Sequence, residues 1–177
     1  MGRGCWAGPL VAGAVILDQP ISGLKDSKKL TKKQRGKLTA EIQVQAAAIG
    51  LGWVKPAEID AIGLTAAVEL AMRRALEQVL IDYDEVIIDG NINFLLENPK
   101  TKAVIKADDS VPAVSAASIV AKVARDNYMV DISEKYPGYG FEKHVGYGTA
   151  LHLERLKLHG ASDLHRASFK PVAALLR

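Results

Sequence analysis

The sequence has almost no cysteine and no long apolar run. Its one cysteine, Cys5, cannot form a disulfide within the chain, which makes a reducing cytoplasm the expected compartment. The apolar stretch 9–17 is shorter than the roughly 18 residues that suggest a membrane span. It also lacks the preceding basic region and the following small-residue cleavage site of a signal peptide. We therefore expect a cytoplasmic protein without a membrane partner.

An excess of one charge is absent too. The chain has 23 Lys and Arg against 20 Asp and Glu, a net charge of +3, so a nucleic-acid surface would have to come from local clustering. Its 177 residues, 49% hydrophobic and 24% charged, fit one soluble globular domain. We find no repeat or linker, and we expect residues 1–177 to form a single domain.

Apolar patterning predicts strands that alternate with helices. A continuous apolar run predicts a buried strand at 9–17, and the capping-box spacing of Thr31 and Gln34 predicts a helix that runs to about Ile49. The remaining patterns predict strands at 51–54, 84–89 and 101–109, helices at 58–80 and 115–133, a loop at 136–148, a helix from Thr149 to Gly160 and a short helix after Pro171. This order is typical of an α/β fold with a mixed sheet.

Asp108 and Asp126 are the first candidates for chemistry. Asp108 follows an apolar strand pattern, where open α/β sheets place their functional groups. Asp126 falls among apolar positions of the next helix, where a carboxylate is costly unless a metal or a cation meets it. A structural ion pair with Lys122 or Arg125 is the alternative, and position alone slightly favours it.

Two neighbouring acids have plainer interpretations. Strand alternation points Asp109 away from Asp108, toward solvent. Asp89 also ends a predicted strand, but Asp-Gly-Asn is an ordinary turn sequence, and we favour the turn. Two carboxylates are few for a pair of hard cations, which generally need several acids.

Two further motifs suggest contact with phosphate. The stretch DSKKLTKKQRGK holds six basic residues from Lys28 to Lys37, and Lys32 and Lys33 fall in the first turn of the predicted helix, where a bound phosphate would offset their repulsion by the helix dipole. A solvated helix face is the equal alternative. In Gly2-Arg3-Gly4 the glycines let the backbone approach a ligand, and the arginine adds a planar guanidinium that can bind a phosphate through two hydrogen bonds.

The C-terminal third offers weaker signals. Tyr147 lies between glycines and could stack on a sugar or base, although packing of its loop onto the core is the more common role. The four histidines share no spacing typical of metal ligands. His165 and Arg166 could contact phosphate, but a surface pair is the safer interpretation.

Taken together, the motifs resemble the bacterial type 2 ribonucleases H (ribonuclease HII) from Gly2 onward. The matching stretches are GRGCWAGPLVAGAVIL, GLKDSKKL, IDGN, KADDSVPAVSAASIVAKVARD, HVGYGT and HLERLKLHGASDLHRASF. The resemblance implies a ribonuclease H-like mixed sheet with flanking helices and a helical C-terminal portion from about residue 137. It also implies endonuclease activity on RNA in RNA–DNA hybrids and on the 5′ side of single ribonucleotides in duplex DNA. The products carry 3′-hydroxyl and 5′-phosphate ends.

The resemblance further implies roles for individual residues. Mg²⁺ or Mn²⁺ is the metal, four acids hold it, and the last two correspond to Asp108 and Asp126. The ribose 2′-hydroxyl is read by Gly2, Arg3, Gly4 and Tyr147, and phosphates are contacted by Lys28 and Lys29. The implied setting is ribonucleotide excision repair and DNA replication, and we expect a monomer.

The family's first two acids are missing here. Relatives carry Asp-Glu-x before the glycine-flanked arginine, and Met1 occupies the x position. We therefore expect an N-terminally truncated form, whose start was assigned downstream of the true one, with impaired two-metal hydrolysis. The alternative is a module that binds RNA–DNA hybrids without cutting them. An unrelated α/β protein would do neither.

Overall fold

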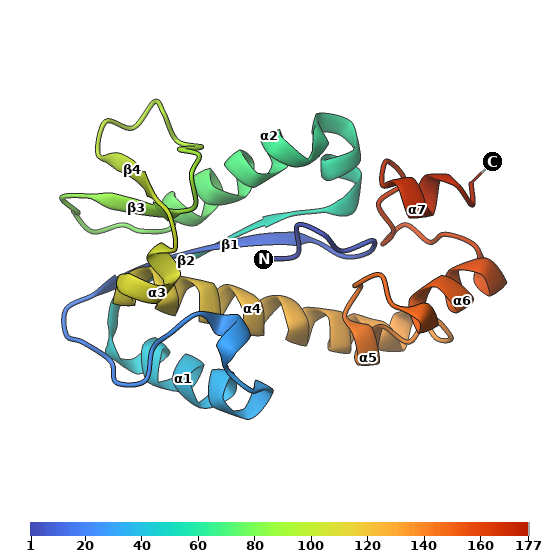
Figure 1. Ribbon diagram of the computed structural model, residues 1–177, viewed down its shortest axis with the longest axis horizontal. Helices are drawn as coiled ribbons and strands as arrows, with labels where there is room; N and C mark the ends of the chain where they lie inside the picture. Colours follow the sequence, from blue (N-terminus) through green and yellow to red (C-terminus); the bar gives the residue numbers. More distant parts are fainter. Residues whose placement is uncertain (177) are drawn as a thin grey trace.

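An antiparallel strand pair runs through the centre of the molecule (Figure 1). The computed structural model describes residues 1–176. In it, β1 (Leu10–Leu17) pairs with β2 (Ala46–Val54) from Leu10 opposite Val54 to Leu17 opposite Ala46. Helix α2 (Pro56–Leu76) packs on one face of this pair and α4 (Pro112–Ile132) on the other (Figure 1). The predicted strand at 9–17 is confirmed.

Glycines let both helices approach the strands closely. A Cβ atom on Gly52 would lie 1.8 Å from the Ala71 carbonyl oxygen of α2, and one on Gly13 would lie 2.5 Å from the Ala117 carbonyl oxygen of α4. The strand pair is therefore held between two helix backbones, with an apolar cluster on each side.

A second, parallel strand pair lies beside α2. β3 (Val86–Asp89) pairs with β4 (Thr101–Val104) from Val86 opposite Thr101 to Asp89 opposite Val104. The α/β class with both kinds of pairing is confirmed. Within residues 1–176 the strands form two separate two-stranded sheets, β1–β2 and β3–β4, instead of one continuous ladder.

Two predicted boundaries are wrong. Helix α1 (Lys32–Gln45) begins with the predicted Thr31–Gln34 capping box, but it ends four residues before Ile49 because Ala46 and the residues after it pair with β1. The predicted strand 101–109 ends at Val104. Lys106 adopts a left-handed conformation, and α3 (Ala107–Ser110) follows, so Asp108 lies in a helical turn beyond the strand.

The remaining helices are short and are joined by loops. These are η1 (Ser27–Lys29), η2 (Ser133–Lys135), α5 (Phe141–His144), α6 (Ala150–His159) and α7 (Lys170–Ala173). Thr149 caps α6, which ends at Gly160 as predicted, whereas the predicted loop 136–148 contains α5. Among the described residues, no helix has the length and apolarity that a membrane crossing requires.

Candidate functional site

A cleft of about 540 Å³ separates the two strand pairs. Its walls are the free edge of β1 and the strand β3, with residues of α2 and α4 above and below. Most of the lining is aliphatic, from β1, β3, Val68 and Met72 of α2, and Ala117 and Ala121 of α4. Polar side chains gather at its rim, so the cleft combines an apolar interior with a charged margin.

The backbone of Met1 starts a ladder along the free edge of β1. The Met1 amine donates to the Val11 carbonyl oxygen, and the Val11 amide donates to the Met1 carbonyl oxygen over 3.0 Å. This mutual exchange is the pattern of an antiparallel pair. Burial, and next the charge of Arg125, lower the pKa of this amine to about 5. The ladder therefore begins at a point where a charged terminus is unfavourable.

Two carboxylates face the cleft together. Asp108, in α3, and Asp89, at the end of β3, both line it. Partial burial raises the pKa of Asp108, and the neighbouring carboxylates of Asp89 and Asp26 raise it further, against the charge of Lys28. Carboxylates that repel one another in this way are stabilised by a cation. The turn interpretation of Asp89 missed this, although its position at a strand end was the signal.

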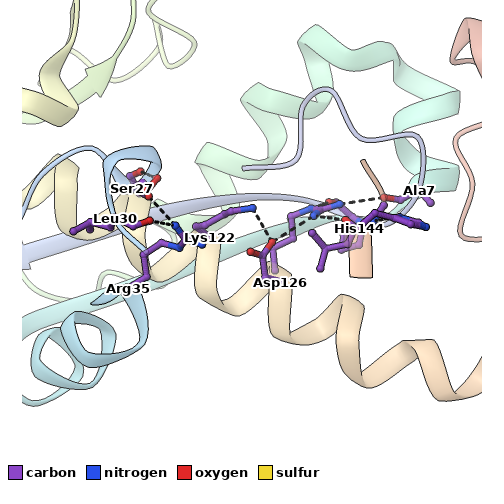
Figure 2. A network of polar contacts seen from close by, with 12 residues as sticks. Ala7, Ser27, Leu30, Arg35, Lys122, Asp126 and His144 are labelled. Atoms are coloured by element: carbon purple, nitrogen blue, oxygen red, sulfur yellow. Dashed lines mark hydrogen bonds and ion pairs between the residues drawn. The ribbon is translucent and has the colours of Figure 1, made fainter. Parts of the chain in front are cut away.

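The stretch 26–30 places Lys28 at the same rim. Asp26 accepts a hydrogen bond from the Lys28 amide (2.9 Å), and Arg35 donates to the carbonyl oxygens of Ser27 and Leu30 (Figure 2). Lys28 lines the cleft and is exposed. The backbone around Lys28 is thus held by hydrogen bonds within the stretch 26–35.

Lys29 points elsewhere. Its Nζ lies 2.6 Å from Asp109 Oδ1, and this hydrogen bond lowers the pKa of Asp109 and raises that of Lys29. The expectation that Asp109 faces solvent agrees with its exposure. Lys29 is outside the cleft lining, so the structure separates it from Lys28.

Asp126 does not line the cleft with Asp108. Its Oδ1 lies 2.9 Å from Lys122 Nζ and 3.9 Å from an Arg125 nitrogen, and the Lys122 and Asp126 side chains are only 18% and 16% exposed (Figure 2). The expected pairing of Asp108 with Asp126 at a metal stays a prediction. The ion pair that was its alternative is present, because Lys122, one turn earlier on α4, lies against the carboxylate.

The glycine-flanked arginine and Tyr147 meet across a backbone bridge. Gly2, Arg3 and Tyr147 line the cleft, whereas Gly4 does not. An isolated antiparallel bridge joins Cys5 to Tyr147, and Arg3 is exposed with its guanidinium 6.0 Å from the Phe94 ring. The structure thus brings together the two motifs that the sequence separates by more than a hundred residues.

The expected surface pair His165–Arg166 is wrong, because both residues are buried. Arg166 donates to the carbonyl oxygens of Gly8 and Arg3, and His165 lies 3.1 Å from His152 between their Nε2 atoms. The Phe141 ring of α5 lies against His165, and the Phe169 ring lies against Arg166. Charged and polar residues are mostly exposed, so the residue types at 165 and 166 gave no signal of burial.

The donor chemistry of the cleft fits a hard divalent cation only in part. Asp89 and Asp108 offer the oxygen ligands that Mg²⁺ and Mn²⁺ accept. Within residues 1–176, however, no group of three or more His, Cys, Asp or Glu side chains is placed to hold a metal ion. Two carboxylates can share a cation only if other oxygens complete its shell.

Comparison with known proteins gives consistent matches over nearly the whole chain. A family model described as ribonuclease HII matches residues 1–172. Ribonuclease HII of Marinomonas sp. (strain MWYL1) is 49% identical over 99% of this chain and 89% of the relative, and that of Janthinobacterium sp. (strain Marseille) is 48% identical over 99% and 84%.

Solved structures share the fold. Ribonuclease H2 from Pyrococcus horikoshii OT3 superposes with a TM-score of 0.82 at 28% identity, over 99% of this chain and 93% of that chain. Bst-RNase HIII, solved in complex with Mn²⁺, superposes with a TM-score of 0.77 at 20% identity, over 99% of this chain and 67% of that chain.

Proposed function

The chain belongs to the ribonuclease HII family, and on that basis we propose that its cleft takes RNA–DNA hybrids and duplex DNA with single ribonucleotides as substrates. The reaction is hydrolysis of the phosphodiester 5′ to a ribonucleotide, which leaves a 3′-hydroxyl and a 5′-phosphate. One observation supports this most: the same cleft is lined by Asp89, Asp108, Lys28, Arg3 and Tyr147.

Recognition depends on the ribose 2′-hydroxyl, the group that distinguishes RNA from DNA at a single nucleotide. The backbone at Gly2–Gly4 can approach a sugar, and the exposed part of the Tyr147 ring can stack on it. Lys28 and Arg3 supply cations for neighbouring phosphates. We keep Lys29 as an outer phosphate contact, which requires it to release Asp109.

Asp89 and Asp108 are the residues that would hold Mg²⁺ or Mn²⁺. Such a cation activates water and stabilises the leaving oxygen in phosphodiester hydrolysis. The mutual repulsion of these carboxylates, seen in the raised pKa of Asp108, supports their role as ligands. Asp126 remains the further ligand that the family resemblance implies, and in that role it would exchange Lys122 for the cation.

We also propose that residues 1–177 alone are impaired, because two acids are too few for two-metal hydrolysis. The missing acids would come from an extended segment that continues the Met1–Val11 ladder along β1 into the cleft. Its ladder hydrogen bonds would satisfy the open edge of β1, and an amide would replace an amine whose charged form burial disfavours.

The test is cleavage of duplex DNA that carries one ribonucleotide, with Mg²⁺ or Mn²⁺. We expect weak or no cutting by residues 1–177, and metal-dependent cutting 5′ to the ribonucleotide once a strand ending in Asp-Glu is added before Met1. In that longer chain Asp89→Asn, Asp108→Asn and Asp126→Asn should each abolish cutting. Retained cutting by Asp126→Asn would remove that residue from the metal site and leave it the ion pair with Lys122.

A second function, binding without cutting, is favoured by the same shortage of acids. It predicts that residues 1–177 bind hybrid duplex but do not cleave it with Mg²⁺ or Mn²⁺. Affinity should fall steeply with salt if Lys28 and Arg3 meet phosphates. Specific cutting by residues 1–177 would reject this alternative.

A further inference from the structure

The side chain of Arg125, on α4, lies between the two recognition motifs, Gly2–Gly4 and the loop of Tyr147. It is fully buried on α4 and donates to three backbone carbonyl oxygens: Pro9 (2.9 Å), Val145 (2.8 Å) and Ala7 (3.1 Å). One of its terminal nitrogens also lies 3.9 Å from Asp126 Oδ1. Two of the acceptors follow the glycine-flanked arginine, and the third precedes Tyr147 by two residues.

Glycines make room for this guanidinium. A Cβ atom on Gly2 would lie 2.3 Å from Arg125 Nε, and Cβ atoms on Gly8 and Gly146 would each lie 3.3 Å from one of its terminal nitrogens. These glycines also have positive φ angles, which other residues rarely adopt. The glycine pattern around the two motifs therefore serves the arginine as well as any ligand.

The same guanidinium also contacts the recognition tyrosine. Its Cζ atom lies 5.6 Å from the centre of the Tyr147 ring, within cation–π range. Next to it, the Trp6 and Ala7 amides both donate to the Gly146 carbonyl oxygen, over 2.9 and 3.3 Å. Arg125 is thus the side chain that bonds both loops at once.

Stability alone is a poor reason for such a residue. A buried charge is costly when no carboxylate pairs with it closely, and Asp126 is 3.9 Å away. The planar guanidinium has several N–H donors and reaches three carbonyl oxygens in different directions. A lysine ammonium cannot reproduce these three hydrogen bonds. The arrangement fixes geometry between two loops.

We propose that Arg125 is a positioning residue that sets the spacing between the Gly2–Gly4 backbone and the Tyr147 ring, so that both engage one ribose. This rests on the proposed function, since it assumes that the two motifs read a ribonucleotide. Arg125 itself touches no substrate. Its loss should weaken ribose selection more than general binding to duplex.

The experiment compares Arg125→Lys with a matched control, Arg166→Lys. Arg166 is a second buried arginine that holds the carbonyls of Gly8 and Arg3, but it donates to neither Val145 nor any neighbour of Tyr147. Fluorescence anisotropy without divalent cation gives the affinity for duplex DNA with one ribonucleotide relative to all-DNA duplex. This ratio is the ribose preference, and it needs no catalysis.

We expect Arg125→Lys to lower the ribose preference roughly tenfold, as expected when a positioned contact is displaced. In a Tyr147→Ala background the same substitution should have almost no further effect, because the ring it positions is gone. Arg166→Lys should leave the Tyr147 contribution intact. Additive effects of Arg125→Lys and Tyr147→Ala would overturn the proposal.

Amide hydrogen exchange provides a readout without substrate. Arg125→Lys should reduce the protection of the Trp6 and Ala7 amides while α4 stays protected, and unchanged protection would overturn the proposal. If Arg125→Lys does not fold, Arg125→Gln, which keeps an amide donor in place of the guanidinium, should give the same result. A wild-type chain without ribose preference would refute the proposed function and this inference together, whereas a preference that Arg125→Lys leaves unchanged refutes only the inference.

Discussion

Acidification should destabilise the protein through a buried pair of neutral histidines, His152 and His165. The Tyr147 carbonyl oxygen can only accept, so His152 Nδ1 donates to it (2.9 Å), and the Ser162 amide can only donate, so His165 Nδ1 accepts from it (3.0 Å). His165 Nε2–H must then donate to His152 Nε2 over 3.1 Å. A proton added to His152 at that atom would break the bond.

The magnitude follows from the two pKa values. Burial lowers the pKa of both His152 and His165 from 6.5 to about 4. Between those values the unfolded chain binds more protons than the folded chain, so stability is complete above pH 6.5 and falls as the pH drops toward 4. At pH 5 the loss is about 2 kcal/mol per histidine, from about 1.4 kcal/mol per pH unit.

The assay is urea unfolding at pH 7 and pH 5, followed by fluorescence. His152→Asn keeps an amide donor for the Tyr147 carbonyl but removes one titrating group, so the loss of unfolding free energy between the two pH values should shrink by about 2 kcal/mol. The Met1 amine, whose pKa is lowered to about 5, acts in the same direction from pH 8 downward. Comparing the variant with wild type cancels that contribution.

His159→Gln is the control, because His159 is exposed. Its pH dependence should match that of the wild type. If His152→Asn also keeps the full wild-type loss between pH 7 and pH 5, the neutral histidine pair is not the source of acid sensitivity, and the reasoning fails.

Three other substitutions test the recognition site and the fold. In a cleavage-competent chain, Tyr147→Ala should slow cutting at a single embedded ribonucleotide by roughly tenfold or more, measured in single turnover; an unchanged rate would leave Tyr147 a packing role. Gly52→Ala should destabilise the fold by about 2 kcal/mol or more in urea unfolding, because its Cβ would lie 1.8 Å from the Ala71 carbonyl oxygen. Thr31→Ala should cost about 1 kcal/mol by removing the hydroxyl that accepts from the Gln34 amide, and a loss near zero would show that α1 does not need this cap.

Local signals in the sequence predicted the elements that local physics decides. The apolar run of β1, the Thr31 capping box and the Thr149–Gly160 helix lie where the patterns place them. The end of α1 could not be predicted, because Ala46 has a high helix propensity and becomes a strand residue only by pairing with β1. Tertiary pairing overrides propensity there.

The buried arginines were missed for a related reason. A charged residue type predicts exposure. Only the three-dimensional arrangement of carbonyl oxygens around Arg125 and Arg166 explains why both are buried. The glycines at 2, 8 and 146 held the signal, since each leaves space beside an arginine or a neighbouring carbonyl. Their number near the two motifs suggested ligand contact and concealed this packing role.

The place of Asp89 shows what a local sequence pattern cannot decide. Asp89 is a turn residue by its sequence, yet β3 ends at the cleft, and after burial the charge of Asp89 is the next cause that raises the pKa of Asp108. Carboxylates converge at the edge of a sheet through tertiary structure, which neither segment shows alone. We therefore expect Asp89→Asn to lower metal-dependent cutting as Asp108→Asn does, and wild-type cutting by Asp89→Asn would return that residue to a turn role.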